Sequence, residues 1–216
     1  SASKSRLEYS YEREFISNNV WHYNNFLSKV LKPSSHIILL STADIYGKNG
    51  EFTEDSLINP VTTYAQSKAI QEYTTLNWCK KLGCTYTILR LSQVYGPNDT
   101  SKKIIPLVLS AFASYNKEKF EFGPTIWGTE RTYRSWVFIK DVVETIILFI
   151  NIGSNSIFNL SGEVNCVQDI LNFCHGYFGI AEKPYMVENS NREDKIIVRH
   201  DLISNTFDFK PTNLIA

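Results

Sequence analysis

The 216-residue sequence lacks the features that would assign it to several large classes of protein. No apolar run reaches the roughly 20 residues of a membrane-spanning helix, and no signal-peptide pattern opens the chain. Lys and Arg total 22, and Asp and Glu also total 22, so no excess charge favours nucleic acid or a membrane surface. We therefore expect neither a nucleic-acid partner nor a membrane partner.

Cysteine is also sparse. The four cysteines, Cys79, Cys84, Cys166 and Cys174, form no C-x-x-C pair, and only His175 adjoins one of them. A structural zinc site needs clustered thiols and imidazoles, so we expect no metal. The spacing does not suggest a disulfide framework either, and we expect a reducing, cytoplasmic setting.

Two further absences concern methionine and glycine. The single methionine is Met186, so Ser1 is not a translation start. None of the ten glycines forms a G-x-x-G-x-x-G or G-x-G-x-x-G loop, which seats a dinucleotide pyrophosphate at a helix N-terminus. The 216 residues therefore carry no such phosphate loop.

What the sequence does contain is centred on residues 36–68. An apolar run, residues 36–40, leads into Ser41-Thr42-Ala43-Asp44, and after a polar loop Tyr64-Ala65-Gln66-Ser67-Lys68 opens a helix. Tyr64 and Lys68 are one helical turn apart and share a face. A Tyr hydroxyl with a pKa of about 10 is a poor base at neutral pH, but a nearby ammonium favours the phenolate. The pattern predicts proton transfer coupled to hydride transfer, with Thr42 sharing the proton or polarising a carbonyl.

A second Tyr-x-x-x-Lys pair shows why the motif alone carries little weight. Tyr115 and Lys119 have the same spacing, as chance allows in a sequence with twelve tyrosines. No strand with a hydroxyl precedes this pair, and we interpret it as surface. The preceding strand and Thr42 distinguish the first pair from the second.

The order of the elements predicts an α/β fold. Residues 36–40 and 84–89 read as buried parallel strands, and a helix over residues 61–82, closed by Gly83, separates them. Strand, helix and strand at this spacing form a βαβ unit, hence a parallel sheet. We interpret the apolar helix over residues 140–150 as almost entirely core. The other predicted elements are helices over residues 10–31, 102–115 and 167–178 and near Leu202, and strands over residues 120–123, 133–138, 157–160, 185–188 and 196–199.

These segments resemble the extended short-chain dehydrogenase/reductase family, the NAD-dependent nucleotide-sugar epimerases and dehydratases. The stretch from Ser41 to Gly47 is similar to the family's Ser/Thr-x-x-Val-Tyr-Gly, and Tyr64 to Lys68 to its Tyr-x-x-x-Lys. Further similar segments follow the family's order: Asn19-Val20 with Asn25-Phe26-Leu27, Arg90 to Pro97, Arg134 to Val143, and Phe158 to Glu163.

The resemblance implies a Rossmann-like doubly wound parallel sheet, of which this chain holds the C-terminal part, with a small α+β substrate-binding lobe. Residues 1–97 would be the remaining part of the NAD(P)-binding domain. Residues 98–216 would be mainly the substrate-binding lobe, with residues 140–160 returning to the first domain. Because the family's Gly-rich loop lies ahead of this region, we expect roughly 70 to 80 residues to be missing before Ser1.

The resemblance also implies roles for residues around the strand end. Tyr64 would be the catalytic acid/base, Lys68 its activator and a ribose-binding group, and Thr42 the proton partner. Together with Tyr64 and Lys68, Ser41 and Leu91 would contact the cofactor, NAD or NADP.

Three residues would bind a nucleotide-diphosphate sugar. Arg134 would grip the diphosphate in bidentate fashion, and Arg192 loosely matches a second family arginine. Gln93 stands where the family commonly has a substrate-binding Asn, with an amide one methylene longer. Asn19 would be either a buried, backbone-bridging residue or an ordinary polar helix residue.

Asp44 separates the candidate reactions. In the dehydratase branch two acidic positions commonly follow the catalytic Thr, whereas here they are Ala43 and Asp44. We therefore favour a nucleotide-sugar epimerase or reductase of surface-polysaccharide metabolism. A 4,6-dehydratase that uses Asp44 is the alternative, and a non-catalytic sugar-nucleotide-binding protein is the third reading. A homodimer is expected by analogy with the family.

Overall fold

The computed structural model describes residues 12–116, 123–127, 132–188 and 194–215. Its centre is a parallel sheet in the order β1-β3-β7, formed by His36–Thr42, Thr85–Leu91 and Asn155–Leu160. Helix α3, Thr63–Leu82, connects β1 to β3, which pair in parallel along their whole length. The predicted βαβ unit and the α/β fold are confirmed. Among the described residues, β1 is paired along one edge only.

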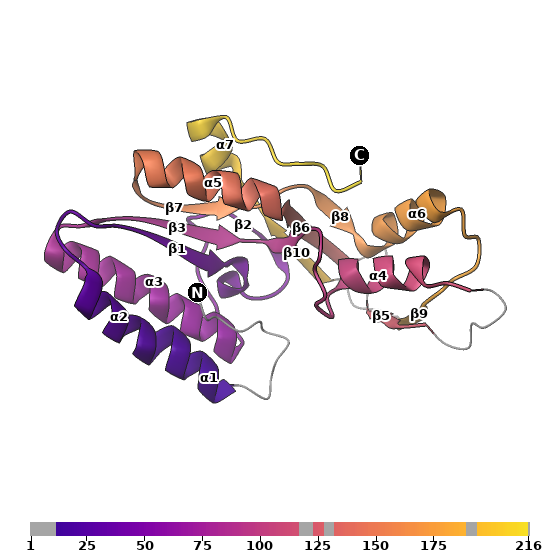
Figure 1. Ribbon diagram of the computed structural model, residues 1–216, viewed down its shortest axis with the longest axis horizontal. Coiled ribbons are helices and arrows are strands. Elements are labelled where there is room, and N and C mark those ends of the chain that lie inside the picture. Colours follow the sequence, from indigo (N-terminus) through magenta and orange to yellow (C-terminus); the bar gives the residue numbers. More distant parts are fainter. Residues whose placement is uncertain (1–11, 117–122, 128–131, 189–193, 216) are drawn as a thin grey trace.

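Helices cover both faces of this sheet (Figure 1). On one face α3 packs beside α1 (Glu12–Ile16), η2 (Ser17–His22) and α2 (Tyr23–Val30). These three segments form the helix predicted over residues 10–31, with a π-helical turn, η2, in its middle. On the opposite face lie α5 (Ile139–Ile152) and α7 (Asp201–Phe207).

Local signals fix both ends of α3. The Thr62 hydroxyl accepts the N–H of Ala65 at 3.1 Å, so Thr62 caps the helix start. Gly83 adopts a left-handed conformation with φ +73°, and its N–H donates to the carbonyl of Cys79 at 2.8 Å. Tyr64 and Lys68 therefore lie in the first two turns of α3.

A second sheet continues from the first. β4 (Gln93–Tyr95) follows β3 after one residue and pairs in parallel with β6 (Thr132–Phe138). β6 also pairs with β10 (Asp194–Val198), and β10 with β2 (Gly50–Phe52). β8, Val164–Cys166, lies antiparallel to β6. Strand β4 ends at Tyr95, which pairs with Phe138, the last residue of β6.

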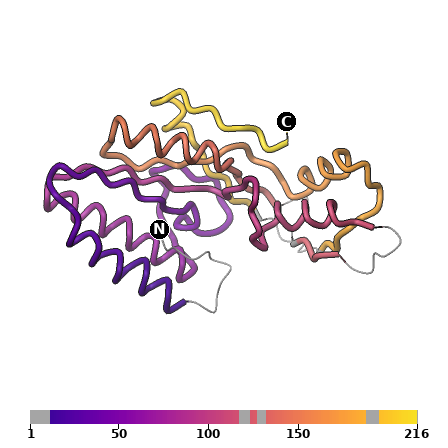
Figure 2. Tube along the Cα trace, viewed as in Figure 1, coloured from indigo at the N-terminus to yellow at the C-terminus, as the bar shows by residue number. Residues whose placement is uncertain are grey.

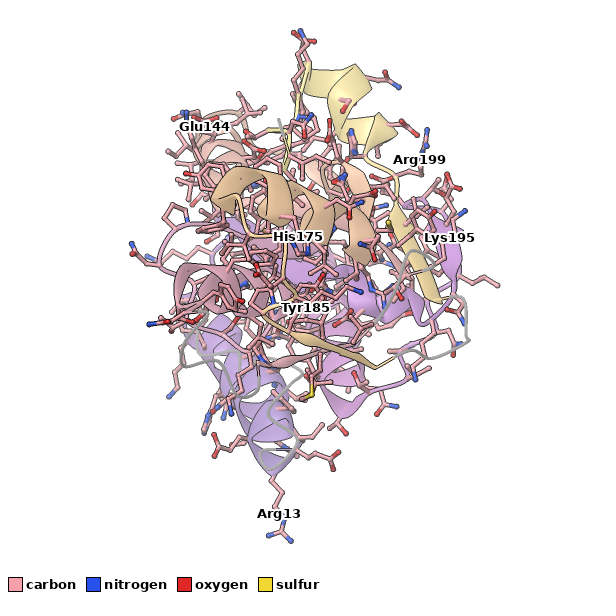
Figure 3. All side chains as sticks on the ribbon, turned by 90° about the vertical axis from the view of Figure 1, so that its right-hand side faces the viewer. Arg13, Glu144, His175, Tyr185, Lys195 and Arg199 are labelled. Atoms are coloured by element: carbon pink, nitrogen blue, oxygen red, sulfur yellow. The ribbon has the colours of Figure 1, made fainter. Side chains whose placement is uncertain are left out.

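The remaining elements form a lobe at one end of the molecule (Figure 2). Helix α4 (Ile104–Ala113) packs on α6 (Val167–Phe178), beside the parallel pair β5 (Thr125–Trp127) and β9 (Met186–Glu188). His175 Nε2 and the Tyr185 hydroxyl lie 3.0 Å apart, which ties α6 to the segment before β9 (Figure 3). The core of this lobe consists of Ile105, Val108, Phe112, Ile126, Trp136, Val167, Ile170, Leu171, Cys174 and Tyr185.

Several predictions need correction. Helix α5 is not almost entirely core, because Ile139, Val143, Ile147, Ile150 and Ile152 are 40–66% exposed. The 3-10 helix η3 (Ala43–Tyr46) and strands β2, β4, β5 and β8 were not predicted. The strand predicted over residues 120–123 lies mostly outside the described residues. None of the described helices combines the length and the apolar composition needed to cross a membrane.

Candidate active site

The candidate site lies where β1 ends. Thr42 is the last residue of β1, and its Oγ1 accepts the N–H of Asp44 at 3.2 Å, which starts η3. Helix α3 packs against both β1 and η3. In the sheet, Thr42 pairs with Leu91, the last residue of β3. The fold therefore gathers Thr42, Leu91 and the first turns of α3 at the carboxyl edge of the sheet, where open α/β sheets bind ligands.

Lys68 is deeply buried within this site. Lys68 is only 3% exposed, and its Nζ donates to Gln71 Oε1 at 2.6 Å. Burial lowers the pKa of Lys68 to about 8, and the nearby Glu72 carboxylate opposes that shift. The ammonium is therefore close to losing its proton just above neutral pH. Tyr64, one turn earlier, has its ring edge-on to Phe15 at 5.5 Å between centroids.

A buried ion pair lies one helical turn beyond Lys68. Arg90 Nη2 donates to Glu72 Oε2 at 2.9 Å, and Arg90 Nε donates to Glu72 Oε1 at 3.2 Å. Ser41 Oγ donates to the same Oε1 at 2.5 Å. All three residues are 4–6% exposed. This bidentate pair ties α3 to the ends of β1 and β3.

Arg90 extends the network to the other side of the site. Its Nη1 donates to the Tyr46 hydroxyl at 2.9 Å and to the Glu54 carbonyl at 3.2 Å. The Tyr46 hydroxyl donates to Asn159 Oδ1 at 2.6 Å, and the Asn159 N–H donates to Glu54 Oε1 at 2.8 Å. Burial acts to lower the pKa of Arg90, but the contacts with Glu72 outweigh it and raise that pKa. The guanidinium is therefore the charged centre of the network.

Most of this network was not predicted from the sequence. Arg90 was expected only as part of a motif, and Glu72 was not a candidate residue. One signal was available, because Glu72 lies four residues after Lys68 and so faces the same side of α3. The predicted cofactor residue Ser41 proves to be a hydrogen-bond donor to Glu72.

Asn19 illustrates how the neighbouring helix is held. It is 2% exposed, so the buried alternative is correct, but its Nδ2 donates to the Ser67 side chain at 3.0 Å. No backbone bridge by its side chain is found among the contacts of the described residues. The bond places η2 directly against the turn of α3 that carries Tyr64 and Lys68.

The candidate substrate residues lie on the second sheet. Gln93 begins β4 and pairs with Trp136 of β6, two residues after Arg134, so strand alternation places Gln93 and Arg134 on one face. Arg134 Nη1 donates to the carbonyl of Tyr133 at 2.8 Å. Arg192 lies outside the described residues. Within the described parts of the chain, no group of three or more His, Cys, Asp or Glu residues is placed to hold a metal ion.

The parallel sheet, with Thr42 at a strand end beside a Tyr-x-x-x-Lys helix, defines an α/β protein of the short-chain dehydrogenase/reductase type. The model of the NAD dependent epimerase/dehydratase family matches residues 2–161. The chain belongs to that family.

Curated relatives include 4,6-dehydratases. The chain is 29% identical over 158 residues to dTDP-glucose 4,6-dehydratase of Haemophilus influenzae, covering 70% of this chain and 43% of that protein. It is 28% identical over 178 residues to dTDP-D-glucose 4,6-dehydratase of Homo sapiens, covering 77% and 48%. The chain thus spans less than half the length of these relatives.

Solved structures share the fold. DesIV, a dTDP-glucose 4,6-dehydratase from Streptomyces venezuelae with NAD and TYD bound, matches with a TM-score of 0.80 and 20% identity, covering 99% of this chain and 67% of that one. UDP-glucuronic acid 4-epimerase from Bacillus cereus, in complex with UDP-glucuronic acid and NAD, matches with a TM-score of 0.77 and 21% identity, covering 93% and 64%. Both confirm the Rossmann-like α/β fold.

Proposed function

We propose that the protein is an NAD-dependent enzyme that epimerises or reduces a nucleotide-diphosphate sugar. The observation that carries this proposal is the position of Thr42, Tyr64 and Lys68 at the carboxyl edge of a parallel sheet, in a chain of the epimerase/dehydratase family. The fold alone would not suffice, since one fold hosts many activities.

In the proposed reaction, Tyr64 removes the proton of a sugar hydroxyl. Its phenolic oxygen needs a cation nearby, because an unassisted phenol is a weak base at neutral pH. Lys68 supplies that charge while its amine is protonated. Thr42 contributes a hydroxyl that shares the substrate proton. When bound, NAD supplies the acceptor for the hydride that leaves the sugar carbon.

The donor set of the site fits one end of the dinucleotide. Hydroxyls at Thr42 and Tyr64 and the ammonium of Lys68 suit a ribose and a nicotinamide, and Leu91 adds an apolar neighbour beside Thr42. NADP would place the same demands on these residues. The Gly-rich loop that would seat the pyrophosphate is not among the 216 residues. We therefore assign only the nicotinamide-ribose end of the cofactor to this chain.

On the substrate side, we propose that Gln93 and Arg134 contact the sugar nucleotide. Their common face on β4 and β6 supports this assignment. Arg192 remains a candidate for a second phosphate contact. We also propose the functional division into a cofactor-binding part, residues 1–97, and a substrate-binding lobe, residues 98–216, from which residues 140–160 return to the first part.

A 4,6-dehydratase is the second candidate. It is favoured by Asp44, a carboxylate two residues after Thr42 in the chain. The backbone N–H of Asp44 donates to Thr42 Oγ1. The named 4,6-dehydratases among the relatives support the same reading. In this reaction Asp44 would protonate the leaving hydroxyl.

We further propose a cytoplasmic homodimer. Large apolar side chains are exposed on the helical layer that carries the site: Trp21 is 66%, Phe26 58% and Tyr73 62% exposed. A second copy packed on η2, α2 and α3 would cover them. Light scattering of the wild-type protein and of a Trp21→Lys variant tests this, and a wild-type monomer would contradict it.

Product analysis separates the two reactions. The full-length protein is incubated with UDP-, GDP-, CDP- and dTDP-sugars, with NAD for epimerisation or dehydration and with NADH for reduction of a keto sugar. The products are examined by NMR. A sugar in which one hydroxyl-bearing carbon is inverted supports the epimerase. A sugar in which a keto group has become a hydroxyl supports the reductase. A 4-keto-6-deoxy product that disappears in Asp44→Asn supports the dehydratase. Turnover of none of the four classes would contradict the proposal.

A further inference from the structure

Two cysteines that are not part of the candidate site lie side by side. The Cys84 thiol donates a hydrogen bond to Cys79 Sγ, and the two sulfurs are 3.1 Å apart. Both thiols are free, and the residues are 3% and 6% exposed. Cys79 Sγ also donates to the Thr85 carbonyl at 3.7 Å. The other two cysteines, Cys166 and Cys174, provide internal references because neither has a thiol partner among the described contacts.

The turn that ends α3 creates this pair. Cys79 lies in the last turn of the helix, and the left-handed Gly83 reverses the chain so that Cys84 returns beside it. The Gly83 N–H is bound to the Cys79 carbonyl at 2.8 Å, which fixes the spacing of the two residues. A disulfide needs its sulfurs about 2.05 Å apart, so these two sulfurs need approach by only about 1 Å.

We propose that Cys79 and Cys84 form an oxidisable dithiol, which a small-molecule disulfide converts into an intramolecular disulfide. In the first step the thiolate of one cysteine attacks the small disulfide, forms a mixed disulfide and releases one small thiolate. In the second step the other cysteine attacks the protein sulfur of that mixed disulfide and releases the second small thiolate. The two thiol protons pass to the released thiolates, so the protein loses two electrons and the small disulfide gains them.

The position of the disulfide at the end of α3 determines which part of the protein it would affect. Tyr64 and Lys68 lie in the first turns of α3, whereas Cys79 lies in its last turn, beside the start of β3. The disulfide would therefore fasten the far end of α3 to the sheet without touching the candidate catalytic residues. Ends of helices open more readily than their centres, and the last turn must open for the reagent to reach these buried thiols. The bond would act as a reversible lock on that turn.

Peptide mapping of the oxidised protein gives a direct test. The protein is treated with glutathione disulfide at mildly alkaline pH, where more thiolate is present, then alkylated in denaturant and digested with trypsin. Trypsin cuts after Lys80 and Lys81, so Cys79 and Cys84 leave in separate peptides, residues 69–80 and 82–90. The expected result is one species that contains both peptides and separates on reduction. The titre of free thiols falls from four to two.

Variants and reference cysteines complete the test. Cys79→Ser and Cys84→Ser are each expected to stop at a mixed disulfide. Cys166 and Cys174 leave together in the peptide of residues 141–192, and both are expected to be recovered in alkylated form. Oxidised wild-type protein is expected to melt at a higher temperature than the reduced protein. A titre that stays at four, or peptides 69–80 and 82–90 recovered only separately, would overturn the proposal even if both variants failed to fold.

Discussion

The ion pair between Glu72 and Arg90 gives the sharpest prediction about stability. Glu72→Gln preserves the size of the side chain and leaves an amide oxygen to accept the Ser41 hydroxyl, but it removes the charge that faces Arg90. The Arg90 guanidinium, in a residue 6% exposed, would then be buried without its counter-ion. Breaking a buried pair by removing one partner costs about 3–5 kcal/mol. We expect a loss of that size in the free energy of unfolding.

Urea unfolding followed by circular dichroism measures this loss by linear extrapolation. The double variant Glu72→Met/Arg90→Leu removes both charges and is expected to be more stable than the sum of the single changes predicts, because neither charge is left unpaired. An excess stability of about 1 kcal/mol or more over additivity would establish the coupling.

Glu144→Gln is the matched control. Its carboxylate pairs with Lys140 at 3.7 Å, but the two side chains are 62% and 69% exposed, and Glu144 lies at the periphery of the molecule (Figure 3). Exposed pairs of this kind contribute less than about 1 kcal/mol. If Glu72→Gln destabilised the protein no more than Glu144→Gln, the buried pair of Glu72 and Arg90 would not contribute to stability as proposed.

Three further predictions concern single residues. Burial lowers the pKa of Lys68 to about 8 from 10.5, so between these pH values the unfolded chain binds more protons, and stability should rise with pH by up to about 3 kcal/mol. Lys68→Met should lack this rise when urea unfolding is compared at about pH 7 and pH 10, and an equal rise in the variant would refute it. Gly83→Ala should cost about 1 kcal/mol, since φ is +73° although no atom lies within 4 Å of the added Cβ. Gly176→Ala, in helix α6 with equal space, should instead stabilise by about 0.5–1 kcal/mol, and equal signs for the two glycines would contradict the argument.

The sequence was informative where the determining signals are local. The βαβ unit around α3 follows from two apolar runs, a helix between them and Gly83 at its end, and each signal lies within a few residues of what it determines. The positions of Thr42 at a strand end and of Tyr64 and Lys68 in the first turns of a helix were predicted for the same reason. Their catalytic roles are proposals. Strands β2, β4, β5 and β8 were not predicted because each has only three residues, too few for an alternation pattern.

Contacts that depend on how the helices and strands pack together could not be predicted from the sequence. Glu72 and Arg90 are 18 residues apart, and their pairing requires α3 to lie over β3 at one rotation. The exposed apolar residues of α5 were interpreted as core because composition does not reveal which faces of a helix are covered. Cys79 and Cys84 lack the C-x-x-C spacing, and their contact arises only from the left-handed turn at Gly83.

In the proposed function, Tyr64 is the base that starts oxidation of a nucleotide-diphosphate sugar. Rapid-mixing absorbance of the NAD-loaded full-length protein, with the sugar nucleotide identified by product NMR, measures formation of the reduced cofactor directly. We expect Tyr64→Phe to slow this step by about 100-fold or more, while calorimetry shows sugar-nucleotide binding changed by less than about twofold, or about 0.4 kcal/mol. Reduction in Tyr64→Phe at the wild-type rate would show that Tyr64 is not the base.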